Sequence, residues 1–136
     1  TPDVDAMIVA LGGNDVLRGI DPAVTRANIA GILRAARDAD VAVLLVGMRA
    51  PGNYGADYKA AFDAIWPELA EQYGTLYHPS FFEGMAEGDD PAAARRFMQP
   101  DGIHPNARGV ERIVAAMGPK VLELIARARK GGGDSE

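Results

Sequence analysis

AMIVALGGND, residues 6–15, joins an unbroken apolar run to two glycines and two short polar residues. A strand that is apolar at every position is typical of a parallel sheet, where both faces of the strand are buried. The Gly-Gly-Asn-Asp stretch that follows has two interpretations. It is either a plain turn, since Gly, Asn and Asp all favour turns, or the rim of a binding site. Parallel sheets bind ligands at the carboxyl ends of their strands, so a site is expected here.

Two further strands and three helices are predicted after this stretch. Residues 41–46 (VAVLLV) form a second buried strand, and residues 75–78 form a short third one. Strands that alternate with helices predict an α/β fold with a parallel sheet and helices on both faces. The first strand, over residues 4–11, needs a neighbour on each side if it is buried. The chain therefore resembles the C-terminal part of a larger fold, whose first strands are supplied elsewhere or missing.

The helices are predicted from their caps and from apolar residues at helical spacing. Asp21 and Pro22 favour the start of the first helix, and Asn106 favours the start of the last. Pro67 is expected to kink or restart the second helix, and Pro119 to break or kink the third. The predicted helices cover residues 22–37, 57–72 and 106–129, and a short helix is possible over 92–97. The face of the first helix predicted to be buried carries Val24, Ile29, Ile32, Leu33 and Ala36.

The composition of the chain argues against several classes of function. We expect residues 1–130 to be the C-terminal portion of one domain and residues 131–136 to be a disordered tail. The 136 residues carry a net charge of −5. That charge argues against a nucleic-acid surface. No apolar stretch approaches the ~20 residues that span a bilayer. There is no cysteine, and two histidines do not suffice for a metal site. No phosphate-binding glycine loop or dinucleotide fingerprint is present. We therefore expect no metal and no cofactor.

DGIHPN, residues 101–106, carries the second chemical signal. A carboxylate three residues before a histidine can accept the imidazole Nδ1–H and leave Nε2 free as a general base. Pro105 favours an extended conformation at His104, outside the helix that Asn106 caps. The alternative is an Asp-Gly turn beside a helix cap, with an incidental histidine. His78 has no carboxylate close in sequence, and we expect it to be structural or solvent-facing.

LGGNDVLRG, GMRAPGNYGADY and DGIHPNARG, in this order, resemble the SGNH (GDSL) hydrolases, most closely the bacterial arylesterases and thioesterase/lysophospholipases. The resemblance implies a flavodoxin-like three-layer fold with a five-stranded parallel sheet. It also implies that Asn14 donates to the oxyanion hole, that Asp101 is the acid of a catalytic triad and that His104 is its base. The positions implied to contact substrate are Gly13, Val16, Leu17, Arg18, Arg49, Pro51 and Tyr54.

The nucleophile of the family is missing from these residues. The family carries it in an N-terminal Gly-Asp-Ser motif, and the two serines of this chain, Ser80 and Ser135, lie in neither that motif nor a comparable turn. An N-terminal segment of the same protein is therefore the expected partner. The resemblance implies export to the periplasm or secretion, although no residue here indicates export.

The residues and the resemblance together leave two functions open. The first is a serine ester hydrolase that acts on small acyl or aryl esters or thioesters and is inactive without its serine. The second is a catalytically inert fragment or a non-enzymatic α/β binding module.

Overall fold

The computed structural model describes residues 3–12, 18–50, 52–81, 95–101 and 104–134, and only the backbone of 130–134. The described strands form one parallel sheet in the order β1-β2-β3. The register pairs Ala6 with Ala42 and Leu44 with Leu76. The strands are β1 (Ala6–Val9), β2 (Ala42–Val46) and β3 (Leu76–His78). The predicted parallel α/β sheet is therefore confirmed.

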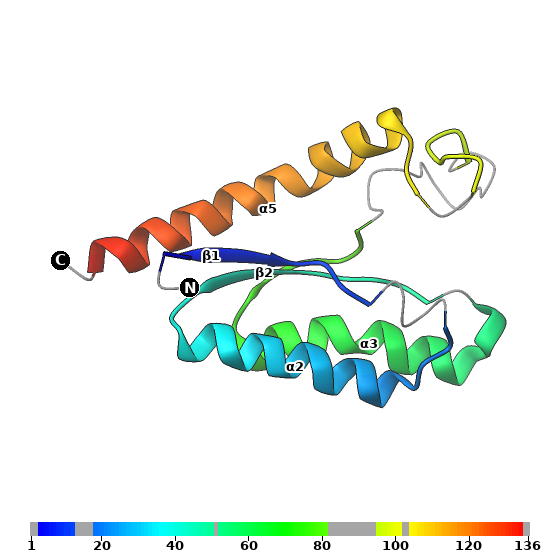
Figure 1. The fold of residues 1–136 in the computed structure, drawn as a ribbon, viewed down its shortest axis with the longest axis horizontal. Coiled ribbons are helices and arrows are strands. Elements are labelled where there is room, and N and C mark those ends of the chain that lie inside the picture. The colour runs from blue at the N-terminus through cyan, green and yellow to red at the C-terminus, as the bar shows by residue number, and fades with distance from the viewer. Residues whose placement is uncertain (1–2, 13–17, 51, 82–94, 102–103, 135–136) are drawn as a thin grey trace.

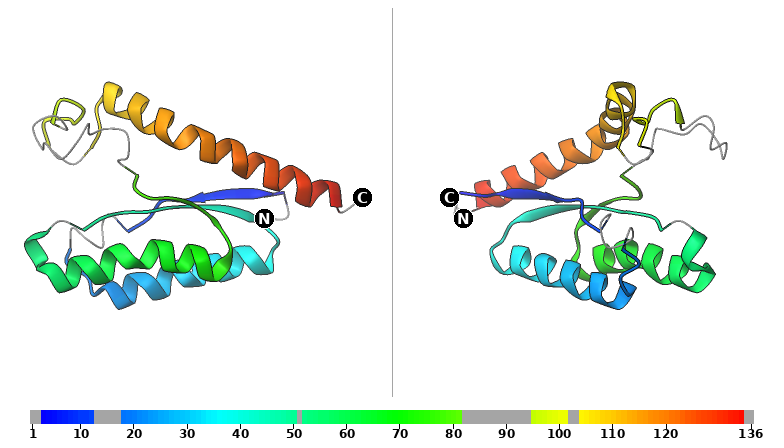
Figure 2. Two further views of the ribbon diagram at one scale, coloured as in Figure 1. Left: turned by 180° about the vertical axis from the view of Figure 1, so that it is seen from behind. Right: turned by 45° about the vertical axis from the view of Figure 1, so that its right-hand side comes forward.

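Helices cover both faces of this sheet, in three layers (Figures 1 and 2). Two helices lie side by side on one face, and the C-terminal helix crosses the other face diagonally. The helices are α2 (Pro22–Asp38), α3 (Ala56–Tyr73) and α5 (Ala107–Asp134), with a short 3₁₀ turn, η1 (Gly52–Tyr54), ahead of α3. Within the described ranges, no helix has the length and apolar character needed to cross a membrane.

The helices begin where the sequence predicts and continue through their prolines. The Asp21 side chain accepts a hydrogen bond from the Ala23 N–H at 2.9 Å and so caps α2. Pro67 lies inside α3 and Pro119 inside α5, and each helix is assigned as one element. The predicted restart of α3 and break of α5 are therefore wrong, and the alternative, a kink at each proline, stays a prediction. A proline removes one backbone hydrogen bond, and the bonds on either side can keep the helix in register.

Two details of the helices differ from prediction. Val24 is half exposed, and Thr25 is buried in its place. Thr25 precedes Ile29 by four residues and therefore shares its face of α2. The second difference is that α5 continues past Arg129 to Asp134, so the predicted disordered tail overlaps the end of the helix.

Side chains alternate across β2 and divide the core into two parts. Leu44 and Val46 face α5 and pack with Leu76 and Leu124. Leu45 faces α2 and α3 and belongs to the larger cluster, which includes Phe62 and Trp66. Both sides of β2 are buried, as its continuous apolar sequence predicts.

β1 is an edge strand of the described sheet, although its sequence is apolar. Ile8 is 46% exposed, whereas Ala6 and Ala10, on the same face of β1, pack against the cluster beneath α5. The exposure of Ile8 follows from the position of α5, which lies mainly over β2 and β3. Apolar surface is thus left open beside the edge of the sheet.

One flank of α5 continues this open surface. The other flank faces the β3 side, because Arg127 Nη1 donates to the carbonyl of Gly74, just ahead of β3, at 3.1 Å. Helical spacing puts Val114 and Ile125 together on the opposite flank, toward β1. Val110 lies one turn before Val114, near the start of the helix. All three are exposed, Val114 by 63%. We call Ile8 together with Val110, Val114 and Ile125 the open apolar surface.

Candidate active site

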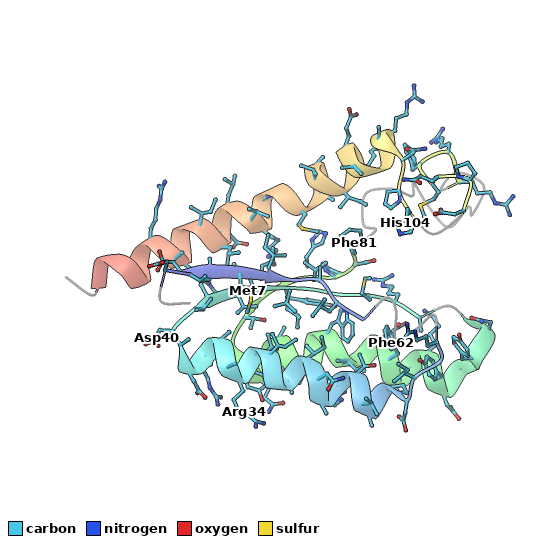
Figure 3. All side chains as sticks on the ribbon, in the orientation of Figure 1. Met7, Arg34, Asp40, Phe62, Phe81 and His104 are labelled. Atoms are coloured by element: carbon cyan, nitrogen blue, oxygen red, sulfur yellow. The ribbon has the colours of Figure 1, made fainter. Side chains whose placement is uncertain are left out.

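Asp101 and His104 form a pair at the carboxyl end of the sheet, on the α5 side (Figure 3). The Asp101 Oδ2 atom lies 2.7 Å from Nδ1 of the imidazole, and Asp101 Oδ1 accepts the backbone N–H of His104 at 3.0 Å. The carboxylate therefore fixes both the main chain and the ring of the histidine. The imidazole is 68% exposed, which leaves it accessible to a reactant. The spacing predicted the contact between the carboxylate and Nδ1 but not the bond to the backbone N–H, and the catalytic roles of the two residues stay predictions.

The segment that carries the pair is a loop closed at its base. We call residues 97–101 and 104–106 the histidine loop. Gln99 N–H donates to the His104 carbonyl at 2.7 Å, and Asn106 N–H donates to the Phe97 carbonyl at 2.8 Å. Met98 and Pro105 form an antiparallel bridge between these two bonds. The loop thus has backbone bonds of its own that hold its ends together.

Asn106 joins this loop to the start of α5. Its Oδ1 accepts the Gly109 N–H at 3.0 Å, which is an N-cap bond. Its Nδ2 donates to the carbonyl of Arg96 at 2.7 Å and to that of Met98 at 3.3 Å. The sequence predicted the cap. The two bonds to the opposite strand of the loop were missed, because nothing in the local pattern specifies them.

We expect Asn106→Ala to lower the free energy of unfolding by about 2–3 kcal/mol, because it removes a helix cap and two loop-closing donors together. Asp21→Ala is the matched control. It removes a cap that holds no loop, and we expect it to cost about 1 kcal/mol. Denaturant unfolding of both variants makes the comparison. Equal losses in the two variants would mean that the bonds from Asn106 to the loop add no stability.

The loop that follows β1 starts at a glycine that the packing requires. Gly12 has a φ of +110°, and a Cβ at this position would lie 2.9 Å from a ring carbon of Trp66. A side chain here would meet both backbone strain and an aromatic ring. Gly12 therefore needs the backbone conformation and the space that glycine provides, whereas residues 13–17 of the expected turn lie outside the described residues.

The loop that follows β2 is bonded to β3 and to α3. Gly47 N–H donates to the His78 carbonyl, and Phe81 N–H donates to the Gly47 carbonyl, each at 2.8 Å. Further along, Ala50 is buried, whereas Arg49 and Tyr54 are exposed. The Tyr54 ring packs on Tyr58, with ring centroids 4.9 Å apart. We call residues 47–50 and 52–55 the β2 loop.

The structure describes only part of the expected site. Asp101 and His104 are brought together. The loops that carry Arg18 and Tyr54 lie next to each other. A Cβ at Gly19, the residue after Arg18, would lie 3.1 Å from the Tyr54 ring. Arg49 is exposed on the β2 loop. The other expected positions, Gly13, Asn14, Val16, Leu17 and Pro51, lie outside the described residues, and so do residues 92–94 of the short helix predicted over 92–97.

The remaining candidates have other surroundings. His78 is buried on β3, which agrees with the first of the two expectations for it, a structural role, and contradicts the second, a solvent-facing position. Ser80 follows β3 and is partly buried, next to the Phe81 that bonds to Gly47. The sequence prediction that no nucleophile lies in this chain was based on motif context, and it stays a prediction.

The family model described as "GDSL-like Lipase/Acylhydrolase family" matches residues 1–112, which include all three motifs. The chain belongs to the GDSL-like lipase/acylhydrolase family. This membership agrees with the resemblance seen in the sequence.

Curated members of the family have esterase and thioesterase names. The chain is 35% identical over 119 residues to Esterase TesA of Pseudomonas aeruginosa, a match that covers 88% of this chain and 56% of the relative. It is 38% identical, also over 119 residues, to Thioesterase 1/protease 1/lysophospholipase L1 of Escherichia coli K12, with 88% and 54% covered. The chain therefore spans about half the length of these relatives.

A solved structure shows the same fold. It is that of AlinE4, described as an SGNH-hydrolase family esterase, which is 44% identical to this chain with a TM-score of 0.64. The match covers 88% of this chain and 60% of AlinE4. The described layers of this chain thus have the same fold as the corresponding part of a solved esterase.

Proposed function

We propose that this chain carries the acid and the base of a serine ester hydrolase that acts on small acyl or aryl esters or thioesters. The observation that carries the proposal is the Asp101–His104 pair, in which one carboxylate holds both the ring and the main chain of the histidine. Family membership supports the same activity. The nucleophile is a serine from a segment outside this chain, which we call the serine segment. The chain together with this segment is the assembled enzyme.

Each group has one task in the proposed reaction. His104 Nε2 removes the proton of the serine hydroxyl as its oxygen attacks the ester carbonyl, and the imidazolium then protonates the leaving alcohol or thiol. Asp101 keeps the proton on Nδ1 and stabilises the positive charge of the ring. Asn14 donates its amide to the developing oxyanion. Water, activated by the same histidine, then hydrolyses the acyl-serine.

The substrate is proposed to lie between the loops at this rim. Gly13, Val16, Leu17 and Arg18 border it after the first strand. Arg49, Pro51 and Tyr54 border it after the second. The exposed positions of Arg18, Arg49 and Tyr54 support this assignment, because a bound ester has to reach side chains that the core does not occupy.

The open apolar surface supports the location of the serine segment. Among the described strands none lies on the outer edge of β1, and a strand of another segment can add there. Ile8 and Val114 then supply the apolar contact for the face of that segment. If the added strand runs parallel to β1, as the described strands do, it ends at the same rim as β1, which is the end of the sheet where His104 lies.

The experiment measures hydrolysis of a nitrophenyl ester by the 136-residue chain, alone and with a serine segment taken from a family member. We expect the chain alone to give only background hydrolysis. The assembled enzyme should be faster by at least about 10³-fold, because loss of a catalytic serine removes most of the turnover. A segment whose serine is replaced by alanine is the control. Hydrolysis by the chain alone, equally fast after Ser80→Ala, would contradict the proposal.

A second arm tests where the segment binds. Ile8→Lys puts a charge in the open apolar surface and is expected to weaken binding of a separate serine segment by roughly tenfold or more. Val24→Lys is the matched control, since Val24 is similarly exposed but lies on α2 at the opposite face. Equal binding by the two variants would place the segment elsewhere.

A further inference from the structure

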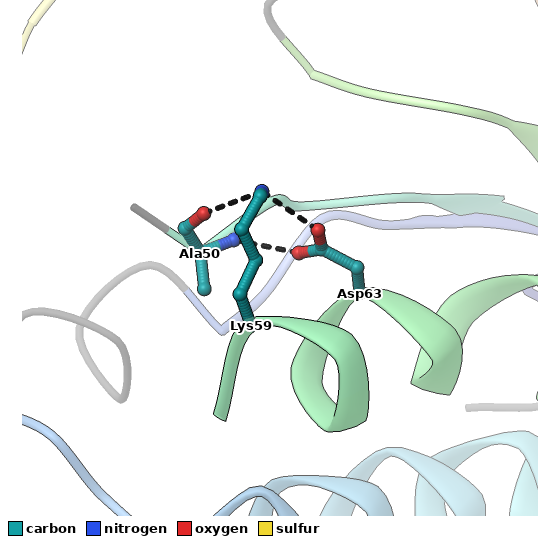
Figure 4. Close-up of polar contacts among 3 residues, drawn as sticks. All are labelled: Ala50, Lys59 and Asp63. Carbon is teal, nitrogen blue, oxygen red and sulfur yellow. Dashed lines mark hydrogen bonds and ion pairs between the residues drawn. The ribbon is translucent and has the colours of Figure 1, made fainter. Parts of the chain in front are cut away.

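The first turns of α3 bind the main chain of the β2 loop through two side chains (Figure 4). Asp63 Oδ1 accepts the Ala50 N–H at 2.8 Å. Lys59 Nζ donates to the Ala50 carbonyl at 2.8 Å and to Asp63 Oδ2, also at 2.8 Å. Three contacts thus close a ring around one residue of the loop.

This pair differs from an ordinary ion pair on a helix surface. An exposed pair four residues apart adds little stability, because water screens it and both side chains lose freedom. Here the partner is a residue that is only 3% exposed, and the pair bonds both its N–H and its carbonyl. A buried backbone group that loses its partner costs free energy, since no water replaces the bond.

The neighbouring residues of α3 hold the adjacent loop. Tyr58 O–H donates to the carbonyl of Ile20 at 2.7 Å, at the end of the loop that follows β1. Phe62 and Trp66 pack beneath Gly12, where the same loop begins. One face of α3 therefore binds both rim loops. In the described part of the chain, Lys59 and Asp63 are the charged residues of α3 that bind the middle of the β2 loop, through Ala50.

We propose that Lys59 and Asp63 are positioning residues that set the place of the β2 loop at the substrate side of the site. Their bonds in Figure 4 are to the main chain of Ala50 and to each other, and we assign neither of them to the chemical step. Their effect passes through Ala50 to its neighbour Arg49 and on to Tyr54. The catalytic consequence rests on the proposed function, whereas the effect on the loop does not.

Hydrogen exchange at the Ala50 amide, followed by NMR on the 136-residue chain, tests the effect on the loop. We expect Asp63→Ala to speed this exchange by roughly tenfold, because the amide loses a charged acceptor. Asp63→Asn keeps an oxygen toward Ala50 and should restore most of the protection. Lys59→Met leaves the Asp63 bond in place and should have a smaller effect than Asp63→Ala.

Lys120→Met is the matched control. Lys120 pairs with Glu123 at 3.2 Å on α5, and its side chain is 40% exposed, against 43% for Lys59. We expect it to leave exchange at Ala50 unchanged. Unchanged exchange in Asp63→Ala, or equal acceleration of every amide in the chain, would overturn the proposal.

Kinetics of the assembled enzyme test the catalytic consequence. Asp63→Ala is expected to raise KM by roughly three- to tenfold with little change in kcat, as loss of uniform substrate binding does. A fall in kcat at constant KM would instead indicate fewer folded molecules and would contradict positioning. If even the unsubstituted assembled enzyme is inactive, the proposed function fails, while the exchange data still decide the role of the pair.

Discussion

His104→Ala is expected to lower the kcat of the assembled enzyme on the order of 10⁶-fold, the loss typical of a serine hydrolase without its base. The serine hydroxyl is then left without an acceptor for its proton during attack. Stability should change little, because the imidazole is 68% exposed and packs against no core. Nitrophenyl ester hydrolysis, with circular dichroism to verify the fold, measures both effects.

Asp101→Asn should cost less, on the order of 10⁴-fold, because the base is retained and only its tautomer and charge stabilisation are lost. Asp38→Asn is the matched control, an exposed carboxylate at the end of α2. We expect it to leave turnover unchanged. If the His104→Ala enzyme kept its full rate, the histidine would be incidental and the chain would act as a non-catalytic module.

Gly109→Ala is expected to lower the free energy of unfolding by about 2–4 kcal/mol. A Cβ at Gly109 would lie 2.2 Å from the Phe97 carbonyl oxygen and 3.0 Å from the Pro105 side chain. The Phe97 carbonyl is backbone and also accepts the Asn106 N–H, so it cannot move without opening the histidine loop. Activity of the assembled enzyme should fall as well. Thermal and denaturant unfolding measure the loss of stability.

Gly31→Ala makes the same change in α2 with the opposite expected sign. Apart from the adjacent backbone of α2 itself, no described atom lies within 4 Å of a Cβ at Gly31. Only helix propensity therefore changes, and alanine should raise the stability by up to about 1 kcal/mol. Comparison of the two substitutions thus separates the effect of helix propensity on stability from the effect of a steric clash. A Gly109→Ala protein as stable as the parent would show that the close approach of Phe97 is absent in solution.

The elements of the fold were largely predictable because their signals are local. The apolar run over 41–46 predicted β2, and Asp21 with Pro22 predicted the start of α2 to the residue. Periodicity was less reliable at single positions: it predicted that Val24 is buried, whereas Thr25 is the buried residue. The end of α5 was also misjudged, since a glycine-rich sequence has low helix propensity yet continues an established helix to Asp134.

The candidate site was predictable only where its partners are close in sequence. Asp101 and His104 are three residues apart, so their spacing alone suggested the pair. Ala50 and Asp63 are thirteen residues apart, and the bond between them depends on how α3 returns along the sheet. The contact of Gly109 with Phe97 likewise depends on the closure of the histidine loop. Such contacts depend on the tertiary fold, and the local sequence pattern did not predict which distant residues meet.

The bonds of Asn106 make the first turn of α5 and the histidine loop open together. When this turn frays, Oδ1 loses the Gly109 N–H, and Nδ2 can leave the carbonyls of Arg96 and Met98 in the same event. Local opening of a helix end costs far less free energy than global unfolding. The fraction of molecules that hold Asp101 against His104 is therefore set by this local equilibrium. On warming, the proposed activity should decline with the opening of this turn, at temperatures where the sheet is still intact.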